Sequence, residues 1–180
     1  HSLAFLRRFY RGLMHRTLWT AALAVTLAFA LVGCDTKHIS ELQEGVSTEA
    51  DVLARFGQPE SVWDGPGGAR ILEYNRQPSG HHNYMITIAP DGRMTALRQV
   101  LNRDNFARVQ PGMRMEEVRR MLGREARRTP YALKQEEAWD WRFIDAPNAQ
   151  MLFTVYFDRD WRVLRTAIAS DPDAPENRGR

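Results

Sequence analysis

The chain has 180 residues, a formal charge of +3 and a pI near 9.3, a balance that ordinarily suggests contacts with nucleic acid. Residues 1–33 contain four of the 25 basic residues and no acidic one, so the remainder has 21 basic residues against 22 acidic ones. Without that segment the protein is nearly neutral and has no long basic run. We therefore expect no nucleic-acid partner.

Residues 1–33 are predicted to form a signal peptide. Basic residues are followed by a predominantly apolar stretch of 15 residues, Leu18–Val32. A membrane-spanning helix needs about 20 apolar residues, whereas the apolar region of a signal peptide runs to about 15. The length favours a signal peptide over the alternative, a signal anchor. Met14 would open a more compact signal and is a candidate for the true start of the chain.

The segment Leu31-Val-Gly-Cys34 at the end of this stretch resembles the bacterial lipobox. The resemblance implies that the cysteine thiol receives a diacylglyceryl group, that the signal is cut before the cysteine, and that the new amine is acylated, as with palmitate. Two or more acyl chains anchor a protein stably, whereas one binds only marginally. Cys34, the only cysteine in the sequence, is therefore predicted to be a lipid-attachment site rather than a free thiol.

An internal repeat follows a short tether over residues 34–38. Three pairs of segments align in the same order at an offset of 66 or 67 residues: Ile39–Val46 with Phe106–Met113, Val52–Gly57 with Val118–Gly123, and Leu72–Tyr74 with Trp139–Trp141. Three matches in order indicate a duplication, with one repeat over 39–104 and another over 105–168. The polar residues 169–180, rich in proline and glycine, are predicted to be a disordered tail.

Each repeat is predicted to be a short helix followed by four strands. In the first repeat Thr48 is a candidate N-cap, and Gly57 stands where a glycine ends a helix. The expected strands are 60–64, 70–75, 83–89 and 93–101, then 125–129, 137–144, 151–157 and 161–168. Short turns between consecutive strands make antiparallel pairs. The predicted fold class is therefore α+β, with two tandem repeats that each carry a short helical segment and a four-stranded antiparallel sheet.

Alternation along the strands separates a core face from a polar face. The core face is predicted to hold large apolar residues, among them Leu72, Tyr74, Trp139, Trp141 and Phe143. The opposite face carries Glu73, Asn75, Asp140, Arg142, Thr154 and Tyr156. Antiparallel sheets commonly leave one face in water. This polar face is either simply solvated or a candidate partner-binding surface.

The sequence contains no recognisable catalytic centre. It lacks the HExxH, GxSxG, P-loop and dinucleotide-binding motifs. His81 and His82 are adjacent in a predicted hairpin loop, where neighbouring side chains point apart, and no carboxylate is spaced to complete a metal site. We therefore expect a protein that is not an enzyme, with no cofactor, no metal and no small-molecule substrate.

The repeat resembles the SmpA/OmlA (BamE-like) lipoprotein domain family. The resemblance is carried by Cys34, by Leu42-Gln-Glu-Gly-Val46, by the helix ending Leu53-Ala-Arg-Phe-Gly-Gln-Pro59, by Leu72-Glu-Tyr74, and by the Asp91-Gly-Arg turn. It implies a periplasm-facing lipoprotein, because members of this family are lipoproteins of that kind. The best-known member is an accessory subunit of the outer-membrane β-barrel assembly machine. Family members usually have one such domain, and the second repeat here lacks the counterpart of Pro59. The tandem arrangement is also similar to the β-lactamase inhibitor protein fold, in which a concave sheet binds an enzyme.

These observations predict a lipid-anchored, non-catalytic scaffold or accessory protein in outer-membrane assembly or envelope integrity. Its partners would be the membrane, through the lipid, and envelope or β-barrel assembly proteins. The alternative is an inhibitor or regulator of a periplasmic enzyme that uses the concave sheet. The expected location is the periplasmic side of the outer membrane. Asp35 leaves inner-membrane retention as an alternative, because an aspartate after the lipidated cysteine resembles the retention signal of enteric bacteria.

Overall fold

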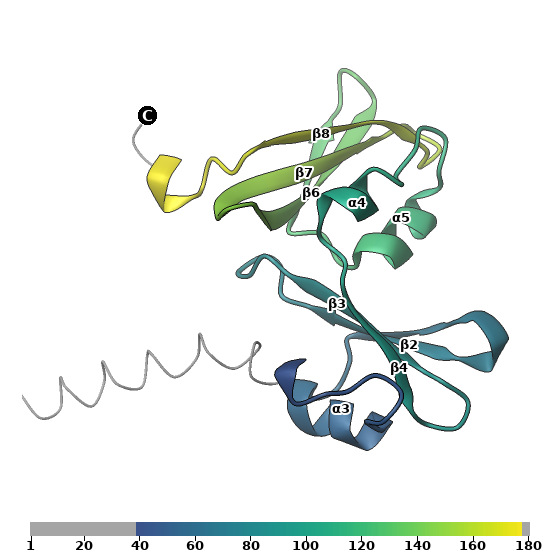
Figure 1. The fold of residues 1–180 in the computed structure, drawn as a ribbon. Helices are drawn as coiled ribbons and strands as arrows, with labels where there is room; N and C mark the ends of the chain where they lie inside the picture. Colours follow the sequence, from purple (N-terminus) through teal and green to yellow (C-terminus); the bar gives the residue numbers. More distant parts are fainter. Residues whose placement is uncertain (1–38, 178–180) are drawn as a thin grey trace, which may run out of the picture. The chain divides into compact units, whose positions relative to one another are not determined.

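The computed structural model describes residues 39–177, and residues from Gln43 onwards form a compact unit that contains both repeats (Figure 1). The predicted signal peptide, Cys34 and the tether to residue 38 lie outside the described residues, as do residues 178–180. Both sheets and the contacts between the repeats therefore belong to the unit that begins at Gln43.

The first repeat is a helix followed by an antiparallel sheet. Its elements are α3 (Glu49–Phe56), β1 (Ser61–Asp64), the short 3-10 helix η1 (Pro66–Gly68), β2 (Arg70–Asn75), β3 (Asn83–Ile88) and β4 (Met94–Gln99). The sheet order is β1-β2-β3-β4. As predicted, Thr48 caps α3, because its hydroxyl accepts from the Asp51 amide and its own amide donates to the Asp51 carboxylate at 2.8 Å. Gly57 ends the helix at a φ of +77°.

The second repeat follows the same plan. Its elements are α4 (Arg103–Phe106), α5 (Met115–Leu122), β5 (Arg127–Tyr131), β6 (Glu136–Asp145), β7 (Ala149–Phe157), β8 (Val163–Ser170) and the short η2 (Pro175–Asn177). The sheet order is β5-β6-β7-β8, and every neighbouring pair is antiparallel. The predicted α+β class with two helix-plus-four-strand halves is confirmed, although the short α4 was not predicted.

Equivalent side chains make equivalent hydrogen bonds in the two repeats. The Tyr74 hydroxyl donates to the Gly57 carbonyl at 2.9 Å, and the Trp141 indole, at the matching position, donates to the Gly123 carbonyl at 3.1 Å. Each bond joins a central strand to the end of the helix of the same repeat, and each satisfies a carbonyl that the helix leaves without a partner. The duplication therefore extends from sequence to local geometry.

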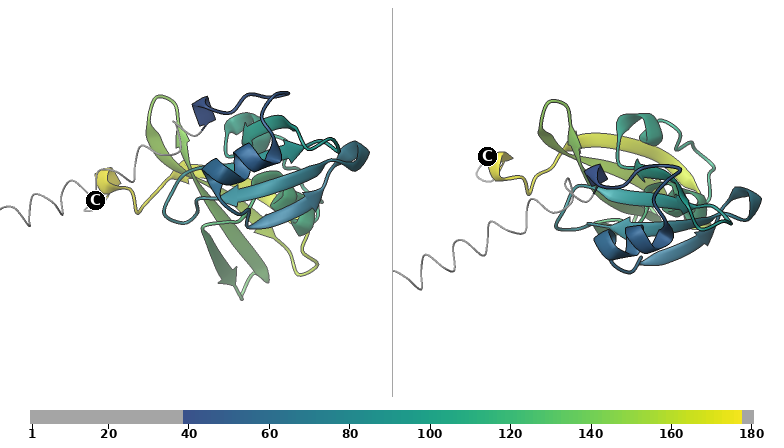
Figure 2. Two further views of the ribbon diagram at one scale, coloured as in Figure 1. Left: turned by 90° about the horizontal axis from the view of Figure 1, so that it is seen from below. Right: turned by 60° about the horizontal axis from the view of Figure 1, so that its bottom comes forward.

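The first sheet is contacted on both faces by helices. On one face lies α3, and the ring centre of its Phe56 is 5.1 Å from that of Tyr74 and 5.6 Å from that of Tyr84. Figure 2 shows this helix lying across the strands. On the other face Met85 joins the core of the second repeat, with Leu122 of α5 and Trp141 of β6. The predicted core residues of β2 and β6 are buried, as expected.

The strands form two separate four-stranded sheets. The described strands do not form one continuous sheet. The inhibitor alternative relies on such a sheet, because a concave sheet binds the enzyme in the β-lactamase inhibitor protein fold. Any surface of that kind on this chain must come from one sheet or from the space between the two.

The prediction that residues 169–180 form a disordered tail is wrong for residues 169–177. Strand β8 runs to Ser170, and Asp171 and Ala174 are buried. The Asp171 amide continues the ladder by donating to the Gln150 carbonyl at 3.0 Å, and Asn177 donates to the Asp171 carbonyl at 2.8 Å. A polar composition indicated disorder, but these side-chain and backbone contacts order the segment.

Candidate functional site

Glu73 lies at the contact between the two repeats. Its side chain is fully buried, receives hydrogen bonds from Trp63 Nε1 at 2.7 Å and Asn75 Nδ2 at 2.6 Å, and forms an ion pair with Arg119 of α5. The prediction that Glu73 belongs to a solvated or partner-binding face is therefore wrong. Helix α5 of the second repeat covers this face of the first sheet, so the carboxylate holds the repeats together.

Asn75 and Asn83 hold the end of α5. The Arg124 amide donates to Asn75 Oδ1 at 2.9 Å, and Asn83 Nδ2 donates to the carbonyls of Leu122 at 2.8 Å and Arg124 at 3.0 Å. These bonds satisfy backbone groups that a helix end leaves unpaired. Asn75 was predicted as a partner-binding residue, but the structure gives its side chain internal partners in the second repeat.

Asp140 and Thr154 are neighbours on the second sheet. Asp140 is nearly buried, accepts from Thr154 Oγ1 at 2.6 Å, and receives Nε and Nη2 of Arg127 at 3.0 and 2.9 Å. The hydrogen bond to Asp140 raises the pKa of Arg127 above its ordinary value. The two predicted residues are thus brought together, on the side of the sheet that faces away from α5. We call this side the outer face; it carries Asp140, Arg142, Thr154 and Tyr156.

Arg142 ties two segments to one end of the outer face. Its Nε donates to the buried Asp171 at 2.6 Å, and its Nη1 donates to the Pro78 carbonyl at 3.1 Å. Its backbone amide and carbonyl both bond the Gln77 side chain, at 3.1 and 2.8 Å. Because its guanidinium already holds the β2–β3 loop and the C-terminal segment, Arg142 acts as an internal clamp at one end of the outer face.

Tyr156 lies towards the other end of the outer face. The guanidinium of Arg165 lies 3.9 Å from the centre of its ring, and the ring of Tyr131 lies 6.4 Å away. Arg165 also pairs with Glu136 at 2.8 Å, and its hydrogen bond lowers the pKa of Glu136. The result is a fixed group of aromatic and paired charged side chains around Tyr156, with Tyr131 and Arg165 exposed.

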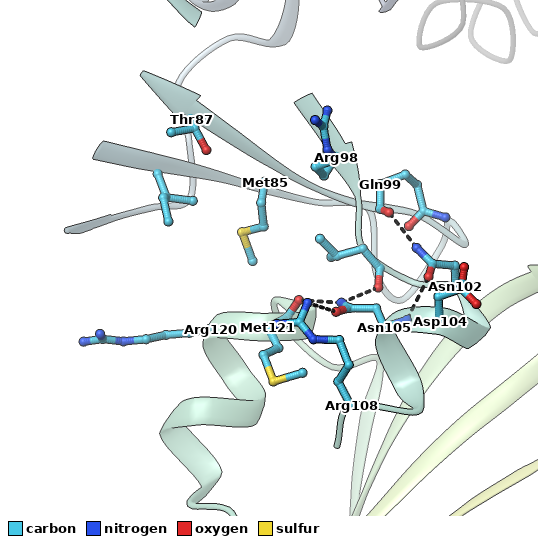
Figure 3. Close-up of a pocket in the computed structure, with 12 residues that line it drawn as sticks. Met85, Thr87, Arg98, Gln99, Asn102, Asp104, Asn105, Arg108, Arg120 and Met121 are labelled. Atoms are coloured by element: carbon cyan, nitrogen blue, oxygen red, sulfur yellow. Dashed lines mark hydrogen bonds between the residues drawn. The ribbon is translucent and has the colours of Figure 1, made fainter. Parts of the chain in front are cut away.

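A cleft of about 520 Å³ opens between the repeats and was not predicted (Figure 3). Met85 of β3 and Met121 of α5 lie on opposite sides of it, and Ile71 and Val100 add apolar surface. Its polar margin includes Arg98, Asn102, Asp104, Asn105, Arg108 and Arg120. Sequence patterns within one repeat cannot show this cleft, because its walls come from both.

The cleft has the chemistry of a binding site. Its volume falls within the range of roughly 300–1,000 Å³ that small-molecule sites occupy. Methionine side chains adapt to irregular apolar ligands. At the margin Arg98 is already paired with Glu44, and Arg120 stacks on the Trp63 ring. The geometry suits an apolar molecule or an apolar side chain of a partner.

The histidines do not form a metal site with the other described residues. Within residues 39–177 no group of three histidine, cysteine or acidic side chains is placed to hold a metal ion. Burial lowers the pKa of His81, and the nearby Arg142 guanidinium lowers it further. His81 is therefore favoured in its neutral form beside the clamp that Arg142 makes.

Cys34, the predicted lipid-attachment site, lies outside the described residues, and its modification stays a prediction. Within residues 39–177, no helix has both the length and the apolar character required to cross a bilayer.

Together these features define a duplicated α+β protein with two candidate binding surfaces, one on the second sheet and one between its repeats. No protein-family model and no curated protein matches the chain. It is similar to the crystal structure of a DUF4309 family protein (YjgB) from Bacillus subtilis, with 19% identity, a TM-score of 0.28, and coverage of 72% of this chain and 82% of that one. It is also similar to the structure of a "putative beta-lactamase inhibitor protein" from Streptococcus mutans, with 9% identity, a TM-score of 0.30, and coverage of 68% and 82%. Similarities at this level carry no functional argument.

Proposed function

We propose that this protein is a lipid-anchored, non-catalytic scaffold or accessory protein that binds other proteins on the periplasmic side of the outer membrane, in β-barrel assembly or envelope integrity. The proposed anchor is Cys34, with the signal peptide and lipobox as its support. The resemblance of the repeats to BamE-like domains supports the proposed role in the envelope.

One structural observation carries the binding role. The first sheet is contacted by helices on both faces, whereas the outer face of the second sheet has no helix over it among the described residues. Hydrogen bonds and ion pairs hold Asp140, Thr154 and Arg165 in place there. A partner that docks on fixed side chains loses less conformational entropy than one that must order them.

Tyr156 is the proposed contact residue of this surface. Tyrosine supplies a large area at a low entropic cost and is enriched among residues that dominate binding energy. The charged side chains near it are already paired, so specificity would come from shape and from hydrogen bonds to those pairs rather than from a free charge.

Co-purification from the envelope after chemical cross-linking tests this function. The comparison is between the wild-type chain, Tyr156→Ala and Val62→Ala, a control at an exposed position on β1 of the first sheet. We expect β-barrel assembly subunits with the wild type and the control, and at least a tenfold loss with Tyr156→Ala. Equal recovery with all three would overturn the assignment of the outer face. Recovery of one soluble enzyme instead would support the alternative, a regulator of a periplasmic enzyme.

A further inference from the structure

Strand β8 is an open edge of the second sheet. Val163 is covered at its start, because its amide donates to the Met113 carbonyl at 2.9 Å and its carbonyl accepts from Gly112 at 2.8 Å. Beyond it, Leu164 lies in a bulge and Arg165–Ser170 pair with β7 on one side only. Within residues 39–177 no backbone segment pairs with the other side of Leu164–Ser170. All seven of these residues are exposed. An open edge of this length is a template for another strand.

The equivalent edge of the first repeat is capped. Strand β4 presents the Leu97 amide away from β3, and this amide donates to Glu44 Oε1 at 2.9 Å. Arg98 forms an ion pair with the same carboxylate, and its hydrogen bond is the main cause that lowers the pKa of Glu44. A charged side chain thus occupies the hydrogen-bonding position that an added strand would need.

The duplication shows that the second repeat lacks this cap. Arg98 of β4 pairs with Met85 of β3, and at the matching position of the second sheet Ala167 of β8 pairs with Thr154 of β7. Ala167 is therefore the equivalent of Arg98. Glu44 aligns with Pro111 in the repeat alignment. Both members of the capping ion pair are therefore replaced by uncharged residues in the second repeat.

The other edges carry protection that β8 lacks. Strand β1 is only four residues long, and β5 contains Pro130 and two arginines. Short length, proline and charge are the devices by which natural sheets block edge pairing. Arg165 is the only charged residue of β8, and its guanidinium is held by Glu136 and the Tyr156 ring.

We propose that β8 pairs antiparallel with β8 of a second copy of this chain, about a two-fold axis at Ala167. The Thr166 amide is equivalent to that of Leu97 and points away from β7, and alternation turns the Ile168 amide the same way. Pairing Thr166 of one copy with Ile168 of the other therefore forms the hydrogen-bonded pairs. The two four-stranded sheets join into one of eight strands.

The charge pattern of β8 allows a second copy as the occupant. In this register Ala167 faces Ala167, and Arg165 faces Ala169, so no like charges lie directly opposite one another. One strand pair buries less than the roughly 1,200–2,000 Å² of a standard stable interface. The association is therefore weak and depends on protein concentration.

Disulfide trapping in the full-length chain tests the register. In a Cys34→Ala background, which removes the native thiol, Ala167→Cys puts one cysteine in each copy on the axis. The two Cα atoms would form a non-hydrogen-bonded pair about 4.5 Å apart, within the range of a disulfide. The control is Ala169→Cys, because Ala169 is an exposed alanine on the same strand. In the proposed register the two cysteines of this control would lie four residues apart, about 13 Å along the strand.

After mild oxidation of the purified protein, we expect at least five times more covalent dimer from Ala167→Cys than from Ala169→Cys. Equal or lower cross-linking at position 167, with circular dichroism showing both variants folded, would overturn the proposal. So would trapping of a different protein at position 167 without any self-adduct.

A charge exchange tests the same contact without a covalent bond. Ala167→Lys and Ala167→Glu should each lower the dimer fraction in sedimentation, since each would place like charges on the axis, and their equimolar mixture should restore it. A mixture no more dimeric than either variant alone would contradict the two-fold register. Neither experiment depends on the anchor or on an envelope partner, so its result is independent of the proposed function.

Discussion

Gly123 is the residue at which the contact between the repeats can be tested with a built-in control. It adopts a φ of +76°, and a Cβ atom there would lie 2.5 Å from Asn75 Oδ1 and 2.9 Å from Asn83 Nδ2. Gly123→Ala therefore adds backbone strain of about 1–3 kcal/mol. It also displaces the two asparagines that hold the end of α5, at about 1 kcal/mol for each hydrogen bond lost.

Gly57 is the matched control, since it occupies the equivalent position of the first repeat. Its φ is +77°, but a Cβ atom there meets nothing within 4 Å. Gly57→Ala thus adds the strain alone. Urea unfolding followed by tryptophan fluorescence should show Gly123→Ala less stable than Gly57→Ala by about 3 kcal/mol, because three hydrogen bonds are lost. Equal destabilisation would refute the inference that the asparagines lock the two repeats at Gly123.

Three further outcomes are expected. Glu73→Gln should lower the free energy of unfolding by about 3 kcal/mol, because it leaves the partly buried guanidinium of Arg119 without its carboxylate. The control Glu49→Gln breaks an exposed ion pair with Arg70 and should change that free energy little in the same urea experiment. The hydrogen bond from Arg103 holds the pKa of Asp145 below its ordinary value of 3.8, so the stabilisation is present above about pH 4 and is lost as the pH falls through the lower folded-state pKa. Asp145→Asn should therefore make the free energy of unfolding less dependent on pH below about pH 4, and unchanged dependence would argue against this pair. Cys34→Ala should abolish fatty-acid labelling and membrane retention, and a variant still labelled would rule out lipidation at this residue.

Elements within each repeat could be predicted because local patterns determine them. The capping residues of α3 stand at fixed spacing, and the alternation of Leu72 and Tyr74 with polar neighbours identifies the buried side of β2. The predicted strand 83–89 differs from β3 by one residue at its end, and 161–168 differs from β8 by two at each end. Boundaries of this kind shift with hydrogen bonds that the sequence does not show.

The candidate site was harder to predict, because it depends on contacts between segments far apart in the chain. Alternation correctly separated Glu73 from the core of its own repeat, but it could not show that Arg119, 46 residues later, covers the opposite face. The same limit applies to Arg142, whose partners are Pro78 and Asp171. Internal repeats carry one usable signal, since a position that is charged in one copy and uncharged in the other indicates that the two copies meet different surroundings.

The most direct test of the central claim is site-specific photo-cross-linking in living cells. A photoreactive amino acid replaces Tyr156 on the outer face in one strain and Val62 on the first sheet in another. If the outer face is the docking surface, position 156 will form adducts with β-barrel assembly subunits in the membrane fraction, and position 62 will form none. Absence of any adduct at position 156 beyond those at position 62 would contradict the account.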